Sequence, residues 1–464
     1  MIKNGLFTSE SVSDGHPDKI CDQISDAILD ACLEQDPMSR VAIEAAIKNK
    51  TLFLLGEITS NAVIEPAEIA RSVLREIGHE DERWGVEVST LRVIEEIHQQ
   101  SAEIGASVDG QETGAGDQGI MFGYAHAGLL NMMPLPIALA HALMERHLAF
   151  RTLSVGETIG PDAKAQVTFK FKDGRPVGLD TVVFSTQHAP DVTLDAVREL
   201  VYTHILSPVL QELLTPLVKV HINPAGSFTM GGPIADAGLT GRKIIVDSYG
   251  GAARHGGGAF SGKDATKVDR SGAYAARQLA RDVLKRGWAK TCEARVAYAI
   301  GISKPVDISF ETFGTETDGS VSNRYQKEGI DVAALMTPSS ILHRLKLDRP
   351  IYRTTSNFGH FGHAGFTWEQ RTLIEDKEGR DQSSLIISKD QPITSVVRRY
   401  KLSISTEEDN ERLKTLLTME RLLLASYGEA GLSQMWKTSL EGMCKAHPYF
   451  GRHIRLEIIN GLNI

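Results

Sequence analysis

The chain is poor in cysteine and lacks long apolar runs. Its four cysteines, Cys21, Cys32, Cys292 and Cys444, show no Cys-x-x-Cys spacing, which argues against a zinc ribbon, a redox pair or a disulfide framework. They are predicted to be buried apolar side chains. Charges or prolines interrupt every apolar stretch before the roughly eighteen residues of a membrane span, and no basic segment precedes an apolar core at the amino terminus. We expect a cytoplasmic protein with no membrane partner.

Positive charge is scarce except in one region. The formal net charge of −9 disfavours a nucleic-acid partner, because binding a phosphate backbone needs Lys and Arg spread over a face. Residues 242–290 depart from this balance, with eleven Lys or Arg against four Asp. Such a local excess suits a small polyanion better than a long one.

Length and periodicity indicate several mixed domains. The 464 residues, 42% apolar and 23% charged, are enough for about two to four domains. The apolar spacing predicts helices over 18–34, 65–77, 193–214 and 271–287, and strands over 41–47, 51–58 and 243–247, with a hairpin at Asp173-Gly174. The fold class predicted is α/β with layers of the α+β type and antiparallel strand pairs, and nothing requires a parallel doubly wound sheet.

The first predicted helix carries polar residues at its start. Pro17 suits the first helical position, and Asp18 stands where the helix dipole favours a carboxylate. His16 and Asp18 therefore lie at a helix amino terminus, which is a natural site for an anion.

Beyond residue 370 the character of the sequence changes. Residues 371–391 are polar and linker-like, and Thr406 to Asp409 resembles a capping box before a leucine-rich helix. We predict a small α+β appendage there, which contains no recognisable chemical motif.

Three segments combine glycine with charge: Gly-His-Pro-Asp-Lys at 15–19, Gly-Ala-Gly-Asp-Gln-Gly at 114–119, and the glycine-rich run at 250–270. Six glycines between 250 and 262 add chain entropy and no side chain to pack. They make sense if the backbone approaches a ligand closely and offers N–H groups to phosphate oxygens.

Two familiar motifs match only in part. The spacing from Gly257 to Lys263 copies a Walker A loop, but Asp264 replaces the Ser or Thr that binds magnesium and no strand immediately precedes it. The His255-Gly-Gly-Gly segment resembles an esterase oxyanion loop, yet the chain has no Gly-x-Ser-x-Gly elbow. A P-loop enzyme and a serine hydrolase are both disfavoured.

Five segments together resemble the S-adenosylmethionine synthetase (methionine adenosyltransferase) family. They are TSESVSDGHPDK at 8–19, GAGDQGIMFGYA at 114–125, GLTGRKIIVDSYGG at 238–251, HGGGAFSGKD at 255–264 and GHFG at 359–362. Their order and spacing also agree, and the resemblance covers residues 3–369. It implies transfer of the adenosyl group of ATP to the sulfur of L-methionine, followed by hydrolysis of tripolyphosphate to pyrophosphate and phosphate.

The resemblance also implies an architecture. We expect three interleaved domains with pseudo-threefold symmetry, at 3–102, 113–230 and 231–370, followed by an extension of unknown role at 371–464. It further implies a homodimer or homotetramer with active sites shared between subunits, two Mg²⁺ ions per site and one K⁺.

Site residues carry over from the family position by position. The catalytic set facing the triphosphate comprises His16, Lys164, Arg242, Lys243 and Lys263. The other ATP contacts are Asp162, Ala163, Ser227, Phe228, Asp236 and Ala259. Methionine is expected at Glu57, Gln100, Asp236 and Lys267, with Mg²⁺ at Asp18 and Asp269 and K⁺ at Glu44.

Two departures leave other functions open. Ser227 replaces an arginine common in bacterial members of the family, and the extension is unlike the usual family ending. A nucleotide-binding regulator without catalysis and a general polyphosphate hydrolase are the alternatives. The intact His16 and Lys263 argue against the regulator, and a hydrolase has no need for Glu57 or Gln100.

Overall fold

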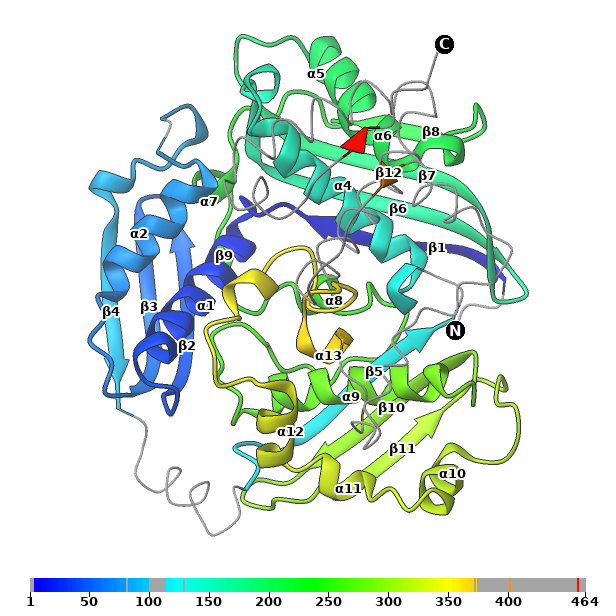
Figure 1. Cartoon of the computed structure of the whole chain (residues 1–464). Coiled ribbons are helices and arrows are strands. Elements are labelled where there is room, and N and C mark those ends of the chain that lie inside the picture. Colours follow the sequence, from blue (N-terminus) through cyan, green and yellow to red (C-terminus); the bar gives the residue numbers. More distant parts are fainter. Residues whose placement is uncertain are drawn as a thin grey trace. The chain divides into compact units, whose positions relative to one another are not determined.

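A computed structural model describes residues 4–80, 82–99, 114–127, 130–370, 373, 400–401 and 457–458. The chain divides into two compact units, Met1–Leu373 and Ile374–Ile464. Within the first unit, three β-sheets each carry a long helix on one face (Figure 1). This mixed arrangement agrees with the predicted α+β layers and the three-domain architecture.

The first sheet is covered by α1 (Pro17–Gln35) and α2 (Pro66–Ile77), close to the predicted helices. Its strands, in sheet order, are β4 (Arg92–His98), β3 (Thr51–Thr59), β2 (Arg40–Lys48) and β9 (Gly238–Leu239). The expected antiparallel pair of β2 and β3 is confirmed, whereas β4 joins β3 in parallel. Apolar side chains of α1 pack on the buried face of β2 to form part of the main core.

The second sheet is built on the predicted hairpin. Its strands, in order, are β1 (Gly5–Val12), β6 (Ile159–Lys172), β7 (Arg175–His188) and β8 (Lys219–Ile222). Its helices are α4 (Leu135–Arg151), α5 (Leu194–Val201) and α6 (Ser207–Leu210). The turn at Asp173 and Gly174 has positive φ at both residues, as a tight hairpin requires. This sheet and α4 enclose a second, smaller core.

The third sheet lies beneath α9 (Val268–Lys285), near the predicted helix 271–287. Its strands, in order, are β11 (Asp307–Glu311), β10 (Thr291–Tyr298) and β5 (Gly119–His126). Four short helices follow along the chain: α10 (Val321–Lys327), α11 (Val332–Leu335), α12 (Pro338–Leu345) and α13 (Thr367–Gln370). A glycine brings α9 close to β5, because a Cβ at Gly123 would come within 1.9 Å of Ala276 C.

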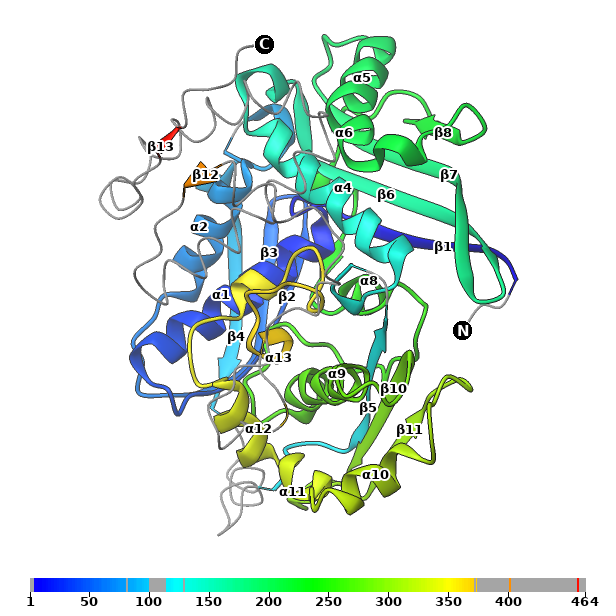
Figure 2. The same cartoon turned by 45° about the vertical axis from the view of Figure 1, so that its right-hand side comes forward.

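Strand exchange interleaves the three layers. β1, near the amino terminus, pairs with β6 more than 150 residues later, β5 pairs with β10, and β9 pairs with β2. Turning the molecule shows the three layers around a common centre formed by α1, α8 (Ile244–Asp247) and α9 (Figure 2). The expected interleaving is therefore present.

Two predicted elements were wrong. Within the strand predicted over 243–247, Ile244–Asp247 form the short helix α8, and the carboxylate of Asp247 on this helix pairs with buried Lys19 of α1. The single helix predicted over 193–214 is interrupted by a π turn at Tyr202–Leu206 and by Gln211, whose φ is 44°. Tertiary contacts override the local β-branched preference of the Ile244-Ile245-Val246 run.

The second unit is described at two points. β12 (Tyr400–Lys401) pairs antiparallel with β13 (Glu457–Ile458). The predicted capping box at 406–409 lies outside the described residues. Among the helices that the structure describes, none has both the length and the apolar character to cross a membrane.

Candidate active site

His16 caps the first helix. It is the N-cap of α1, and its Nδ1 accepts a hydrogen bond of 3.2 Å from the Asp18 N–H. Burial, with the nearby charges of Lys243 and Lys164, lowers its pKa to about 2, and the charge of Asp236 opposes this shift. The ring is therefore neutral, and because Nδ1 accepts, its proton is on Nε2.

Asp18 gathers two cations beside His16. Its Oδ2 lies 2.5 Å from Lys243 Nζ, and its Oδ1 lies 3.9 Å from Arg242 Nε. Asp18 Oδ1 also accepts from the Leu239 N–H at 2.9 Å. The carboxylate thus holds the segment that carries both cations against the amino terminus of α1.

Strand β6 supplies the next group. Asp162 is buried, and burial raises its pKa to about 6 although its Oδ2 accepts from the Gly232 N–H at 2.8 Å. Ser13 fixes the strand, since its N–H donates to Ala163 O and its Oγ accepts from Ala163 N–H. Lys164 and Asp236 are exposed and influence both Asp162 and His16 electrostatically.

These neighbours form what we call the His16 cluster. Its members are His16, Asp18, Asp162, Lys164, Asp236, Arg242 and Lys243. Three of them, Lys164, Arg242 and Lys243, are cations, and His16 is a hydrogen-bond donor. This set suits an anionic ligand at a helix amino terminus.

Ser227 and Phe228 lie beside His188 at the end of β7. His188 Nε2 accepts from the Phe228 N–H at 3.1 Å, and Ser227 Oγ lies 3.4 Å from the same nitrogen. Ser227 is exposed, and Phe228 is half-buried. The Phe228 ring, an expected ATP contact, is therefore not fully buried in the core.

A second group surrounds Lys263 at the start of α9. Lys263 pairs with Asp269, and Lys267 Nζ lies 2.6 Å from Asp264 Oδ2. Asp264 Oδ2 also accepts from the Val41 N–H at 2.7 Å, which ties this turn to β2. We call Lys263, Asp264, Lys267 and Asp269 the Lys263 cluster.

Glu57 and Glu44 lie near the Lys263 cluster on the first sheet. Ala42 is opposite Glu57 in the β2–β3 pair and forms an isolated bridge with Lys263 on its other side. Glu44 is exposed two residues along β2, and therefore on the same face as Ala42. Gln100 lies outside the described residues.

The two clusters adjoin without bonding to each other. A Cβ added to Gly241, next to Arg242, would lie 2.5 Å from the Cβ of Ala259 in the glycine-rich segment. Across residues 4–370 as described, no hydrogen bond or ion pair links Lys263 to His16 or Lys243. Asp18 and Asp26 mark the two regions on α1, about 12 Å apart along its axis.

The glycines of the 250–262 run are explained mainly by packing. A Cβ at Gly256 would lie 1.8 Å from Ile120 O, and one at Gly262 would lie 1.9 Å from Ile43 O. At Gly258 it would lie 2.3 Å from the Asp269 carboxylate. Gly257, with φ of 99°, has nothing within 4 Å of such a Cβ. The predicted reason, close approach to a ligand, therefore remains open at Gly257, while its neighbours accommodate the protein itself.

Sequence reasoning missed a row of carboxylates along α1. Asp18, Asp22, Asp26 and Asp30 recur every four residues and lie on one helix face. They accept from the backbone N–H groups of Leu239, Gly241, Gly262, Tyr352 and Arg353, at 2.8 to 2.9 Å. The four-residue spacing was a visible signal. This row anchors the segments that carry both clusters.

The donor atoms fit hard cations. Asp18 and Asp269 each offer carboxylate oxygens beside a lysine. Mg²⁺ is commonly held by one or two carboxylates together with substrate phosphates and waters. Within the described part of the chain no group of three or more His, Cys, Asp or Glu side chains forms a complete cage. The fit is to a metal that arrives with a phosphate ligand.

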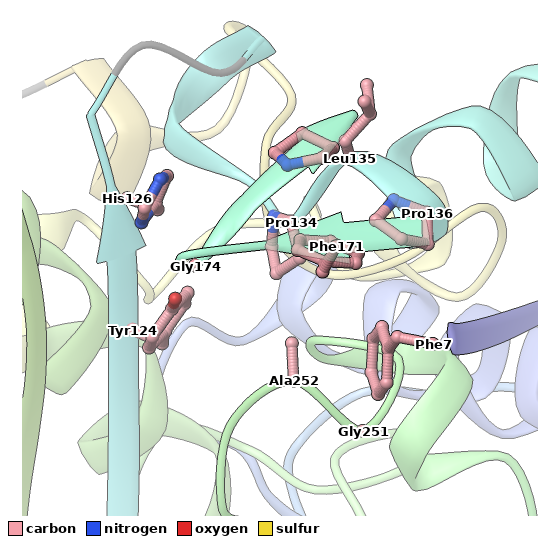
Figure 3. A pocket seen from close by; sticks show the side chains of 11 residues that line it. Phe7, Tyr124, His126, Pro134, Leu135, Pro136, Phe171, Gly174, Gly251 and Ala252 are labelled. Carbon is pink, nitrogen blue, oxygen red and sulfur yellow. The ribbon is translucent and has the colours of Figure 1, made fainter. Parts of the chain in front are cut away.

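A separate cavity of about 190 Å³ lies where β1, β5 and β6 meet the glycine-rich segment (Figure 3). Phe7, Tyr124 and Phe171 line it together with prolines and Gly251. Among the described residues that line it, there is no Lys or Arg that could bind phosphate. The one histidine among them is His126, and burial lowers the pKa of that ring. This cavity is therefore not the place for a triphosphate.

Comparison with protein-family models gives three matches in order along the chain. They are the S-adenosylmethionine synthetase N-terminal domain at residues 4–102, the central domain at 112–228 and the C-terminal domain at 230–370. Both clusters lie inside these matches. The chain therefore belongs to the S-adenosylmethionine synthetase family, whose members are enzymes that make S-adenosylmethionine from ATP and methionine.

Proposed function

We propose that the His16 and Lys263 clusters together form the catalytic site of this synthetase. The observation that carries the proposal is the position of His16 at the N-cap of α1, where its Nδ1 accepts from the Asp18 N–H and leaves the proton on Nε2, near the charges of Lys243 and Lys164. Such a set of donors is suited to the leaving tripolyphosphate.

The chemistry explains why a nucleophilic side chain is unnecessary. The thioether of methionine is a neutral nucleophile, so attack on C5′ of ATP needs alignment and a stabilised leaving group. The S–C5′ bond forms as the C5′–O bond breaks, and its electron pair leaves with tripolyphosphate. Water then cleaves the bound tripolyphosphate to pyrophosphate and phosphate.

Each cation has a role in this step. We assign the His16 Nε2–H to donate to a phosphate oxygen near the breaking bond, while Lys164, Arg242, Lys243 and Lys263 neutralise the accumulating charge. The structure pairs Lys243 with Asp18 and Lys263 with Asp269, so each lysine is already held in position.

Metal ions complete the neutralisation. We assign Asp18 and Asp269 to hold one Mg²⁺ each and Glu44 to contribute to a K⁺ site. Magnesium bound there supplies electrostatic stabilisation of the phosphates. The protein's own contribution is to fix the two carboxylates, Asp18 by the Leu239 N–H and Asp269 by the first turn of α9.

The remaining assignments follow the family pattern. We assign Asp162, Ala163, Ser227, Phe228, Asp236 and Ala259 to ATP, and Glu57, Gln100, Asp236 and Lys267 to methionine. Opposite charges on Glu57 and Lys267 suit the ammonium and carboxylate ends of the amino acid. We also propose domain limits at 3–102, 113–230 and 231–370, with an extension at 371–464.

The active site is proposed to be shared between two copies of the chain. Lys263 pairs with Ala42 of β2, which lies on the sheet face that carries Glu44 and Glu57. The same face exposes Phe53, Leu55 and Leu239 by 39 to 40%. Exposed apolar side chains of this kind mark an association surface. A partner placed there would bring its Lys263 cluster to the His16 cluster of the first copy, as a homodimer or within a homotetramer.

A cytoplasmic location is also proposed. Cys21, Cys32 and Cys292 are unpaired and buried, as predicted, which suits a reducing compartment.

Product formation tests the proposed function directly. Purified protein is incubated with ATP, L-methionine, Mg²⁺ and K⁺, and S-adenosylmethionine is measured by mass spectrometry. We expect sulfonium product and methionine-dependent phosphate release. Phosphate release that needs no methionine would instead identify a polyphosphate hydrolase, and ATP binding without turnover would identify a regulator.

The Lys263→Ala variant tests whether Lys263 stabilises the leaving tripolyphosphate. Loss of one contact to developing charge lowers kcat by about 10²–10³, so this variant should lose turnover while its melting temperature changes little. Lys50→Ala is the matched control, because Lys50 is half exposed and pairs with surface Glu87. Near-normal turnover of Lys263→Ala would remove Lys263 from the site.

A further inference from the structure

His255 lies in the glycine-rich segment and has no assigned role. The neighbouring Arg254 anchors this segment to β10, since its N–H donates to Glu293 Oε2 at 3.0 Å and its Nε lies 3.3 Å from Oε1. The His255 ring packs on Phe260 with centroids 5.5 Å apart. The contact with Phe260 and the anchoring of the adjacent Arg254 thus restrain the His255 ring.

The hydrogen bond at one ring nitrogen fixes the proton at the other. The Gly257 N–H donates to His255 Nδ1 at 2.8 Å. A nitrogen that accepts this bond carries no proton, so the ring proton is on Nε2 and Nε2 is a donor. The same local arrangement, with the N–H two residues ahead on Nδ1, sets the tautomer of His16.

The Nε2 donor of His255 points into the protein. This atom is buried and makes no hydrogen bond within the residues that the structure describes. His255 borders a cavity of about 10 Å³ that Ser248 and Asp269 also line. That volume is at the lower limit of what one water molecule needs.

Asp269 is the carboxylate that lines this cavity. A carboxylate accepts more strongly than a hydroxyl, so Asp269 is favoured over the Ser248 hydroxyl as the acceptor. Asp269 uses Oδ2 to pair with Lys263. Its carboxylate also packs under Gly258, where any Cβ would collide with it.

We propose that His255 is a positioning residue for Asp269: its Nε2–H donates, through one ordered water in this cavity, to the Asp269 carboxylate and so aims that carboxylate at the metal that accompanies the phosphates. The proposal rests on the proposed function and adds a residue to it. Groups that orient a metal ligand in this way typically change metal affinity by about 10–100-fold when removed.

Two substitutions separate this role from a purely structural one. In His255→Asn, the side-chain oxygen occupies the place of Nδ1 and can accept from the Gly257 N–H, but no donor reaches the position of Nε2. In His255→Gln, the amide nitrogen reaches the position of Nε2, and the bond to Gly257 is lost. If His255 only holds the loop, His255→Asn should bind magnesium tripolyphosphate better than His255→Gln. If His255 positions Asp269, His255→Gln should bind it better.

The measurement is calorimetric titration of the full-length protein with inorganic tripolyphosphate, once with Mg²⁺ and once with EDTA. We expect His255→Asn to bind magnesium tripolyphosphate about 10–100-fold more weakly than wild type, with metal-free tripolyphosphate bound equally well. His255→Gln should stay within about threefold of wild type in both titrations. Circular dichroism confirms that both variants are folded.

Three outcomes would overturn the inference. One is wild-type affinity in His255→Asn, and another is an equal loss with and without Mg²⁺. A third is a greater loss in His255→Gln than in His255→Asn. If the folded wild-type protein binds no magnesium tripolyphosphate, the proposed triphosphate site is itself wrong. Failure of the proposed function is therefore seen in the wild type, whereas failure of the His255 proposal is seen only in the variants.

Discussion

At the scale of single residues, Asp162 is a carboxylate whose ionisation opposes folding. One of its oxygens accepts from the Gly232 N–H, and the other is buried with no hydrogen bond among the described residues. Burial raises its pKa from 3.8 to about 6. Between these values the unfolded chain ionises first, so the stability that Asp162 contributes at low pH is lost as pH rises through about 6.

Asp162→Asn should remove this pH dependence. We expect the melting temperature of wild type minus that of the variant to fall from about pH 4 to about pH 6.5 and then level off. Scanning fluorimetry of the ligand-free proteins at a series of pH values measures the difference. Asp30, whose pKa burial also raises to about 6, is present in both proteins and cancels. A difference that rises with pH would contradict the assignment.

At the scale of elements, the carboxylate row of α1 fastens the segments that carry the site. Asp26 forms a two-pronged pair with Arg270, at 2.7 and 2.8 Å, and both side chains are inaccessible to solvent. Asp26 also accepts from the Gly262 N–H, next to Lys263. The position of Lys263 therefore depends on a residue far from it in sequence.

Asp26→Asn should destabilise the protein strongly. Removing one partner of a buried pair leaves the Arg270 charge uncompensated, and the expected loss is about 3–5 kcal/mol. Urea unfolding measures it. Asp195→Asn is the control, because Asp195 pairs with Arg198 on the surface and its loss should change stability by under about 1 kcal/mol. Equal effects of the two substitutions would mean that burial of the pair does not matter.

The close packing of the glycine-rich segment also predicts a loss of stability on substitution. Gly256→Ala places a methyl group against Ile120 O, a backbone atom that no side-chain rotation can move. We expect a loss of about 1–3 kcal/mol. Gly178→Ala, where a Cβ meets nothing within 4 Å, should stay within about 0.5 kcal/mol of wild type. The same unfolding experiment compares them, and a stable Gly256→Ala would contradict the packing explanation.

The sequence predicts elements best where local signals are strong. Apolar spacing located α1, and the Asp-Gly turn located the β6–β7 hairpin. The β-branched residues Ile244, Ile245 and Val246 predict a strand where the structure has the helix α8. In this helix, Asp247 accepts a hydrogen bond from Lys19 of α1. Contacts of that range leave no mark in a local window.

The same limit applies to the site. Family resemblance supplied the residues of both clusters, and the helix signal placed His16 at the start of α1. Their division into two adjoining groups was not predicted, because it depends on how β2 and α9 pack. His255 was also passed over, since its buried Nε2 becomes meaningful only when the Asp269 cavity is seen.

At the scale of the whole molecule, the sharing of sites can be tested with mixed dimers. Copies carrying Lys243→Ala and Lys263→Ala are co-expressed with different tags and purified as heterodimers. If each site combines Lys243 of one copy with Lys263 of the other, one site per dimer is intact and about half of the activity returns. If both lysines act within one chain, activity stays at the level of the single variants.

A second mixed dimer serves as the control, and for it shared sites predict low activity. A dimer of wild type with the double variant Lys243→Ala/Lys263→Ala has a defect in each site if the sites are shared, and so has low activity. If the sites are not shared, it keeps one intact site. A failure of both mixtures to form dimers, seen by native mass spectrometry, would contradict the proposed assembly itself.

The pairing of β1 with β6 has a consequence for synthesis. Gly5 to Val12 find their partners at Phe171 to Lys164. At translation rates of about 5–20 residues per second, the first strand leaves the ribosome roughly 8–30 s before its neighbour exists. The nascent chain must therefore carry an unsatisfied strand edge through that interval, and no cut between the first two family-model segments would leave an amino-terminal fragment with its opening strand paired.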